Sequence, residues 1–193
     1  MNDFEVVQQV TQLMVGFKKP WGICGGWAID LYLAKVTREH HDIEIAVFRK
    51  DQAALQAHLR GWHLTKVVSL TGQRDQWNEG EQLRLPIHEI HAQRHDEVLD
   101  HLEILLEEST DENWKFRRDP RITQPLSKLW EYSQDDIPYM KPEVVLLYKG
   151  KEPTANDEAD FSHVSAVLHA EPRCWLKRAL TTCYPGHHWC DML

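Results

Sequence analysis

The sequence predicts an α/β protein in which a mixed α/β part is followed by a helical part. Two patterns predict this order. Short β-branched runs, of which residues 42–48 are the clearest, alternate with amphipathic runs in the first part, whereas the apolar residues beyond Pro142 recur at helical spacing. With 193 residues, 42% hydrophobic and 27% charged, the chain suits one globular domain or a core with a small appendage. We divide it into a core, 1–112, and a connection with a helical C-terminal region, 113–193.

The core begins with alternating helices and strands. Apolar residues at helical spacing predict a helix over 3–17, with Asn2 or Asp3 as its N-cap and Lys18-Lys19-Pro20 as its end. The elements that follow are a short buried strand over 21–24, the Gly25-Gly26 turn, a helix over 27–34, a strand over 42–48 and an amphipathic helix over 51–59, which ends at Gly61.

Further strands and three helices complete the prediction. The strand candidates are 62–70, 83–91 and 101–106, with a polar loop over 72–80 and a turn near Asp96 between them. A basic and aromatic connection over 114–120 then leads to helices predicted over 144–149, 155–169 and 174–182.

The charge is concentrated in one acidic segment. The net charge is -8, from 22 Lys and Arg against 30 Asp and Glu. Residues 96–112 contain eight Asp and Glu and no Lys or Arg, so the remaining Asp and Glu equal the Lys and Arg in number. Neutralising phosphates requires clustered Lys and Arg, so nucleic acid is disfavoured as a partner.

The chain is expected in the cytoplasm and away from membranes. It has four cysteines and no secretory hydrophobic segment behind Met1, which indicates reduced thiols. No apolar run approaches the roughly 18 residues of a membrane span.

Asp42 and Glu44 are the first candidate site residues. They lie two apart in the predicted strand 42–48, so both carboxylates should lie on one face. Two neighbouring acids on an otherwise apolar strand repel each other and lose hydration, and a divalent cation such as Mg²⁺ removes that conflict. A solvent-facing strand edge is the alternative.

Gly25 and Gly26 lie between a predicted strand and a predicted helix. Free backbone N–H groups and the helix dipole can bind phosphate at such a turn, although a plain tight turn is an alternative. Arg38 and His40 follow at alternate positions just ahead of Asp42. A phosphate cradle, cationic groups and an acid pair therefore occur within about 20 residues of chain.

These two segments resemble the aminoglycoside and lincosamide adenylyltransferases of the polymerase-β-like nucleotidyltransferase superfamily. Residues 25–30 read Gly-Gly-Trp-Ala-Ile-Asp, and residues 37–45 read Thr-Arg-Glu-His-His-Asp-Ile-Glu-Ile. Later segments are similar to uncharacterised members of the group, so the resemblance covers nearly the whole chain: they are 114–122, 137–143, the helix of Lys149, 157–161 and 185–187. The resemblance implies a nucleotidyltransferase core with a mixed β-sheet flanked by helices.

The resemblance also implies a reaction. A hydroxyl of an acceptor attacks the α-phosphorus of a nucleoside triphosphate, most readily ATP, and pyrophosphate leaves with Mg²⁺. Asp42 and Glu44 match the metal-binding acid pair of the family. A third acid from a neighbouring strand helps to deprotonate the acceptor, and Glu103 fits this role. Asp100 is its competitor, because a register slip of one residue changes the face.

The remaining implied contacts are to phosphate. Gly25 and Gly26 would bind it through the backbone, and Arg38 and His40 are candidate triphosphate contacts. Lys149 is a weaker candidate, for which snorkelling at the surface is the preferred interpretation.

Three alternatives remain open. The family often has Asp where this chain has Glu44 and Glu103, so a catalytically silent nucleotide-binding homologue is one of them. An RNA-directed or toxin-like nucleotidyltransferase is another, because 114–121 is a local basic and aromatic patch. The preferred acceptor is a small, hydroxyl-bearing and cationic molecule, such as an aminoglycoside antibiotic, with Asp100, Glu107 and Glu108 around its pocket. The alternative for these three acids is that they lie at a solvated strand end and turn, away from any acceptor.

Two histidine-containing segments do not match zinc signatures. Residues 88–91 lack the two-residue gap of the metalloprotease helix, so His88, His91, His95 and Glu89 are interpreted as a polar strand and turn. The spacing of Cys183, His187, His188 and Cys190 also matches no standard zinc pattern and indicates a helix end.

Overall fold

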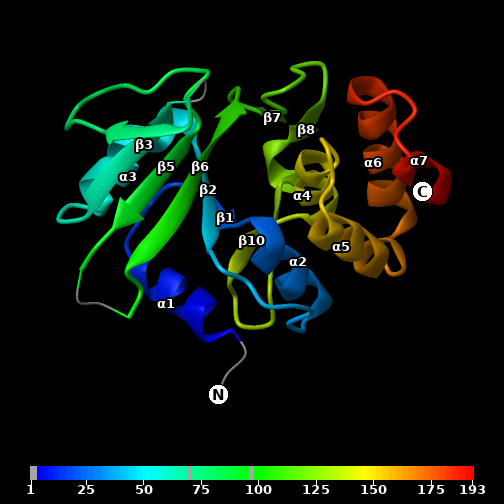
Figure 1. The fold of residues 1–193 in the computed structure, drawn as a ribbon, viewed down its shortest axis with the longest axis horizontal. Helices are drawn as coiled ribbons and strands as arrows, with labels where there is room; N and C mark the ends of the chain where they lie inside the picture. The colour runs from blue at the N-terminus through cyan, green and yellow to red at the C-terminus, as the bar shows by residue number, and fades with distance from the viewer. Residues whose placement is uncertain (1–3, 69–70, 96–97) are drawn as a thin grey trace.

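The computed structural model describes residues 4–68, 71–95 and 98–193. Within these residues ten strands form one mixed sheet, in the order β4-β3-β5-β6-β2-β1-β10-β9, and β7 joins β8 to β6 (Figure 1). The strands are β1 Trp21–Ile23, β2 Glu44–Phe48, β3 His63–Val68, β4 Gln73–Gln76, β5 Glu89–Gln93, β6 His101–Ser109, β7 Asn113–Lys115, β8 Thr123–Pro125, β9 Trp130–Tyr132 and β10 Pro138–Met140.

The helices of the C-terminal part lie together (Figure 1). Figure 1 shows α4 to α7 packed together on one side of the molecule, away from α1 and α3. The helices are α1 Glu5–Leu13, α2 Gly25–Leu33, α3 Gln52–His58, α4 Pro142–Lys149, α5 Ala155–Ser165, α6 Ala170–Cys183 and α7 Trp189–Met192, with short 3-10 helices η1 Arg49–Asp51 and η2 Leu126–Lys128. No helix in the described ranges combines the length and the apolar character needed to cross a bilayer.

The centre of the sheet contains two adjacent rows of very different chemistry. Strand β2 runs parallel to β6 and antiparallel to β1. Ile23, Ile45 and Ile104 lie in register across these strands and are fully buried. One residue away, Glu44 lies opposite Glu103. Because side chains alternate between faces, the apolar row stabilises the sheet and the acidic row is presented on the other face.

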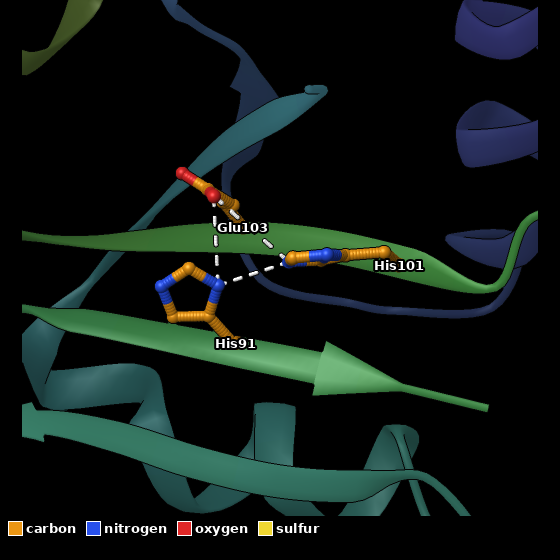
Figure 2. A group of neighbouring side chains, drawn as sticks. All are labelled: His91, His101 and Glu103. Carbon is orange, nitrogen blue, oxygen red and sulfur yellow. Dashed lines mark hydrogen bonds and ion pairs between the residues drawn. The ribbon is translucent and has the colours of Figure 1, made fainter. Parts of the chain in front are cut away.

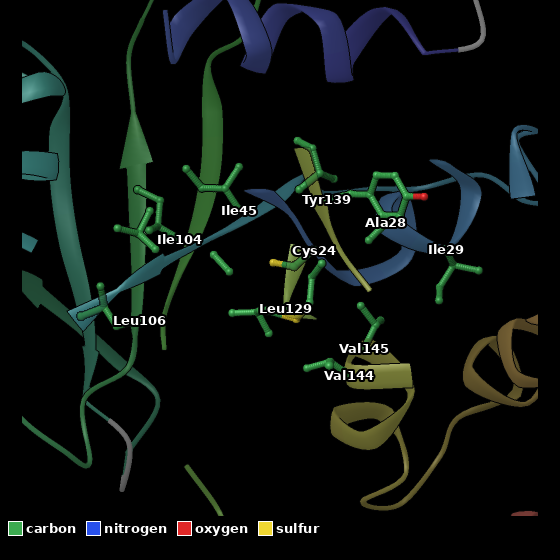
Figure 3. Close-up of a cluster of buried hydrophobic side chains, with 14 of the residues drawn as sticks. Cys24, Ala28, Ile29, Ile45, Ile104, Leu106, Leu129, Tyr139, Val144 and Val145 are labelled. Carbon is green, nitrogen blue, oxygen red and sulfur yellow. The ribbon is translucent and has the colours of Figure 1, made fainter. Parts of the chain in front are cut away.

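The core extends from the sheet into the helices that follow β1 and β10. Ala28 of α2 and Val144 of α4 belong to the same buried cluster as Cys24 (Figure 3). Both strands therefore lead directly into helices that share the buried core with the apolar row.

Several predicted elements differ from the observed ones. Strand β2 begins at Glu44, so Asp42 lies in the preceding loop. The predicted strand 83–91 is wrong in its first half, because the amide of Leu83 bonds to the Gln52 side chain at 2.6 Å and a turn joins Arg84 to Ile87. Strand β4 occupies part of the predicted polar loop. The N-cap residues Asn2 and Asp3, the end of the predicted strand 62–70, and Asp96 lie outside the described residues.

Short strands also occur between the two predicted regions. Strand β10 pairs in parallel with β1, and β9 pairs with β10, so residues 130–140 extend the sheet of the N-terminal part. The helices beyond Pro142 are present as predicted, with α5 ending at Ser165 and α6 beginning at Ala170.

Candidate active site

The acidic row at the β2–β6 pair is the centre of the candidate site. Burial raises the pKa of Glu44 to about 7, and the neighbouring carboxylates of Asp42 and Glu103 add to the effect. Burial likewise raises the pKa of Glu103, with His91 acting in the opposite direction. Asp42 opposes the ionisation of both Glu44 and Glu103, and a divalent cation bound to carboxylate oxygens relieves such a conflict between like charges.

Asp42 is held beside this row although it precedes the strand. Its backbone carbonyl accepts a hydrogen bond of 3.0 Å from the Trp27 indole. The Trp27 ring also packs against His40, with the ring centroids 4.4 Å apart. A tryptophan of α2 thus places the loop that carries two of the predicted site residues.

The N-terminus of α2 meets the acidic row at Gly25. Gly25 has a φ of +62°, and a Cβ at this position would overlap the Glu44 carboxylate. A side chain here would therefore be strained and would also displace Glu44. The N-cap residue Cys24 gives the first turn no side-chain hydrogen bond within the described part of the chain. The helix thus presents its positive end to the acidic row.

Arg38 and His40 lie over the second glycine of the turn. A Cβ on Gly26 would overlap the Arg38 guanidinium and the His40 ring. The structure therefore brings Gly25, Gly26, Arg38 and His40 together, as the sequence order indicated. The Gly-Gly pair is required by this close approach.

Two buried acids, which the sequence patterns did not predict as site residues, hold Arg38 and His40 in place. His40 Nε2 lies 2.6 Å from the carboxylate of Asp30, and both side chains are buried. Arg38 Nε lies 3.3 Å from Asp160 of α5. The only hint in the sequence was that both acids fall within the segments that carry the family resemblance.

Lys149 is also paired, which contradicts the prediction that it snorkels at the surface. Its Nζ lies 2.6 Å from Asp157 and 3.0 Å from Asp160. Burial is the largest single effect on the pKa of Lys149 and lowers it, but the two carboxylates together raise the pKa above its ordinary value. Lys149 in turn favours the ionised form of Glu44. Asp160 thus joins Arg38 and Lys149 next to the acidic row.

Glu103 and Asp100 occupy different environments. Glu103 lies opposite Glu44, with Leu102 and Ile104 buried on the other face of β6. Asp100 lies before the strand and is exposed. Two histidines, His91 and His101, contact Glu103, and the sequence analysis did not associate them with it.

Two members of the acidic segment are not placed around a pocket as expected. Glu107 is buried and accepts hydrogen bonds from the Trp114 indole and the Tyr148 hydroxyl, both at 2.6 Å. Glu108 forms an ion pair with Arg49 at 2.5 Å. Glu107 is thus bound to Trp114 and Tyr148 inside the fold, and Glu108 is bound to Arg49.

The zinc alternatives of the sequence analysis do not assemble. Among the described residues, the metal-ligand types that converge are His91, His101 and Glu103, a set that does not include His88 or His95. Near the C-terminus, His188 pairs with Glu158 at 2.8 Å and the Cys183 thiol donates to a helix carbonyl. The interpretation of that segment as a helix end is confirmed.

Comparisons with known proteins agree with this fold. The crystal structure of the lincosamide antibiotic adenylyltransferase LnuA with lincomycin bound has a TM-score of 0.57 and 18% identity, over 84% of this chain and 97% of that one. The solution structure of the antibiotic-resistance factor ANT(2'')-Ia has a TM-score of 0.60 and 19% identity, over 93% of this chain and 91% of that one. No curated protein matches the chain.

A family model gives the assignment directly. The model of the aminoglycoside-2''-adenylyltransferase family matches residues 6–164, which include every residue of the acidic row and of the glycine turn. Because the match covers most of the sequence, the chain belongs to the aminoglycoside-2''-adenylyltransferase family and is a nucleotidyltransferase.

Proposed function

We propose that this enzyme transfers a nucleoside monophosphate, AMP from ATP, to a hydroxyl of a small antibiotic-like acceptor and releases pyrophosphate in a Mg²⁺-dependent reaction. One observation carries the proposal: Glu44 and Glu103 lie in register on neighbouring strands, with Asp42 beside them and the N-terminus of α2 against Glu44. Acids for a metal and a helix end for phosphate thus occur at one place.

Asp42, Glu44 and Glu103 would hold the metal. Their fit is supported by the raised pKa values of Glu44 and Glu103, which show that the unneutralised carboxylates are unfavourable there. A bound divalent cation would neutralise charge that develops on the phosphate oxygens during transfer.

The side chains of the enzyme would bind the triphosphate and move one proton. The backbone of Gly25 and Gly26, with Arg38, His40 and Lys149, would orient the phosphates. Glu103 would accept the proton of the acceptor hydroxyl as its oxygen bonds to the α-phosphorus. The bond from that phosphorus to the bridging oxygen would break, and pyrophosphate would leave. The raised pKa of Glu103 makes its carboxylate a stronger base for this proton than an ordinary glutamate.

A cationic acceptor is favoured by the charges around the site. The net charge of the protein is -8, and Glu89 and Asp100 lie on the strand and turn next to Glu103. Two solved relatives bear on the choice of acceptor. LnuA was crystallised with lincomycin, and ANT(2'')-Ia with adenylyl-2''-tobramycin, the latter at a TM-score of 0.51 and 17% identity. Tobramycin and lincomycin are therefore the acceptors to test first.

The RNA-directed alternative has little support in the structure. Trp114 and Phe116 of the basic and aromatic segment are fully buried, so neither ring can stack on a base. Arg118 donates to the Tyr148 carbonyl at 2.7 Å and Arg121 pairs with Asp119. The segment leads from β7 to β8, packs its aromatic rings against Tyr148 of α4 and keeps them inside the fold.

Asp42→Asn tests the proposed function. We expect it to abolish pyrophosphate release from ATP in the presence of tobramycin or lincomycin, because it removes one charge from the metal site while keeping its shape. Glu103→Gln should do the same. The exposed Asp111, which has no role in the proposed site, supplies the control Asp111→Asn, which should retain activity.

Two outcomes would contradict the proposal. Equal turnover by Asp42→Asn and the unmodified enzyme would exclude a metal role for Asp42. Tight nucleotide binding by calorimetry, without turnover across a panel of acceptors, would indicate a silent nucleotide-binding homologue. Circular dichroism and thermal unfolding of each variant would show that the fold is retained.

A further inference from the structure

Two histidines and one acid converge on the face of the sheet that carries the acidic row. His91 comes from β5, and His101 and Glu103 come from β6 (Figure 2). One ligand atom from each of these residues lies within 4.8 Å of the other two. In the described part of the chain this is the group that can hold a metal ion through nitrogen as well as oxygen.

The spacing of the three atoms suits a tetrahedral ion. His91 Nδ1 lies 2.9 Å from His101 Nε2 and 3.5 Å from Glu103 Oε1, and His101 Nε2 lies 3.9 Å from the same oxygen. Bonds of about 2.0–2.1 Å to a tetrahedral Zn²⁺ place its ligand atoms roughly 3.3–3.4 Å apart. The three observed separations fall on both sides of this value, so side-chain adjustments of up to about half an ångström would admit the ion.

Glu89 orients the central histidine for this purpose. Its carboxylate lies 2.8 Å from His91 Nε2 and can accept a hydrogen bond from that nitrogen. In the tautomer that donates to Glu89, the lone pair of the ring is on Nδ1, which lies close to His101 and Glu103. A carboxylate behind a metal-binding histidine is the usual arrangement around zinc, where it fixes the tautomer and the ring orientation.

The exposure of the three side chains leaves a route for an ion. The His91 side chain is only 2% exposed, whereas those of Glu103 and His101 are 20% and 36% exposed. The buried histidine is therefore rigid, and the outer one opens the group to solvent. Three protein ligands with one open position are the donor set of many zinc sites.

We propose that His91, His101 and Glu103 form a Zn²⁺ site next to the carboxylates assigned to Mg²⁺. Imidazole nitrogens favour Zn²⁺ over Mg²⁺, which prefers oxygen ligands and keeps its waters. Glu103 belongs to both sets. Zn²⁺ on its carboxylate would therefore block the proton transfer assigned to Glu103 and inhibit the enzyme, a consequence that rests on the proposed function.

Calorimetry of the metal-free full-length chain with ZnCl₂ tests the site without any substrate. We expect one saturable Zn²⁺ per chain. His101→Gln, at the most exposed ligand, should weaken binding at least tenfold, and Glu89→Gln should weaken it by roughly ten- to a hundredfold. His188→Gln, at an exposed histidine paired with Glu158, is the matched control and should bind as the unmodified chain does.

The result that overturns the proposal is absence of a saturable site, or equal affinity in the unmodified chain and His101→Gln. Thermal unfolding gives a second readout, because Zn²⁺ should raise the midpoint of the unmodified chain and not that of His101→Gln. Inhibition assays then test the consequence. A chain that binds Zn²⁺ but transfers no nucleotide would contradict the proposed function alone, whereas a transferase insensitive to Zn²⁺ would contradict the inhibitory role.

Discussion

Glu44 is held in an environment that opposes its own charge. Its pKa is about 7 in the folded chain because of burial first and then the carboxylates of Asp42 and Glu103. In the unfolded chain a glutamate titrates near its ordinary value of about 4.3. A folded-state pKa above the unfolded value means that the contribution of Glu44 to stability is fully present below the unfolded pKa. That contribution is lost as the pH rises to about 7.

A pH series of unfolding free energies tests this assignment. Between pH 4.5 and pH 8, in the presence of a chelator, the unmodified chain should lose up to about 3 kcal/mol relative to Glu44→Gln, since each pKa unit corresponds to about 1.4 kcal/mol. Urea unfolding at each pH gives the two free energies. Glu79→Gln, at an exposed acid, is the control and should follow the unmodified chain.

Mg²⁺ should reduce this loss, because a cation between the carboxylates favours their ionised forms. If Glu44→Gln and the unmodified chain lost the same stability over this pH range, Glu44 would have an ordinary pKa and the acidic row would be solvated.

At the scale of elements, the side chains of Arg38 and His40 limit which residue can occupy position 26 at the start of α2. Glycine in a helix ordinarily costs about 1 kcal/mol relative to alanine, so Gly26→Ala should stabilise a free helix. Here the new Cβ would overlap the Arg38 guanidinium and the His40 ring, and His40 is fixed by its buried contact with Asp30. We therefore expect Gly26→Ala to destabilise the protein by roughly 1–3 kcal/mol and to weaken nucleotide binding.

A double-mutant cycle with Arg38→Ala identifies the cause. If the flexible end of Arg38 is what the new methyl group meets, the stability penalty of Gly26→Ala should fall by at least about 0.5 kcal/mol in the Arg38→Ala background. Additive effects of the two substitutions would instead place the obstacle at His40. A stabilising Gly26→Ala would refute the overlap itself.

Elements with a strong local signal could be predicted from the sequence. The β-branched run of β2, the glycine turn before α2 and the alternation in β6 each point to one structure, and they position Glu44, Gly25 and Glu103 correctly relative to one another. Strands β8, β9 and β10 have only three residues each, and β8 and β10 contain a proline, so their pairing is decided by partners elsewhere in the chain.

The same reason explains which site residues were missed. Asp160 meets Arg38 across 122 positions of the sequence, and His91 meets His101 only because β5 turns back onto β6. Neither pair has a periodic or spacing signal. The division of the chain at residues 112 and 113 stays a proposal, and β9 and β10 extend the sheet from beyond that point.

At the scale of the whole molecule, the end of the chain supports the site through α5. The Trp189 ring of α7 stacks on Phe161 of α5, with centroids 4.3 Å apart and planes 7° apart. Its indole also donates to Glu158 at 2.9 Å. Helix α5 begins with a capping box between Thr154 and Asp157. Through Asp157 and Asp160 it holds Lys149 and Arg38, so the last helix is connected to the side of the site that carries these two basic residues.

Trp189→Ala tests this connection. Trp189 is fully buried, so its removal should lower the free energy of unfolding by about 3–5 kcal/mol, measured by urea denaturation. Met192→Ala, on the same helix but 52% exposed, is the control and should cost less than about 1 kcal/mol. If the loss of Trp189 displaces α5 while the sheet stays folded, Asp160 should hold Arg38 and Lys149 less well. The Trp189→Ala enzyme should then also show a raised KM for the nucleotide. A variant that loses stability with an unchanged KM would show that α7 stabilises the fold without positioning the cations, since Arg38 and Lys149 would then keep their places on Asp160.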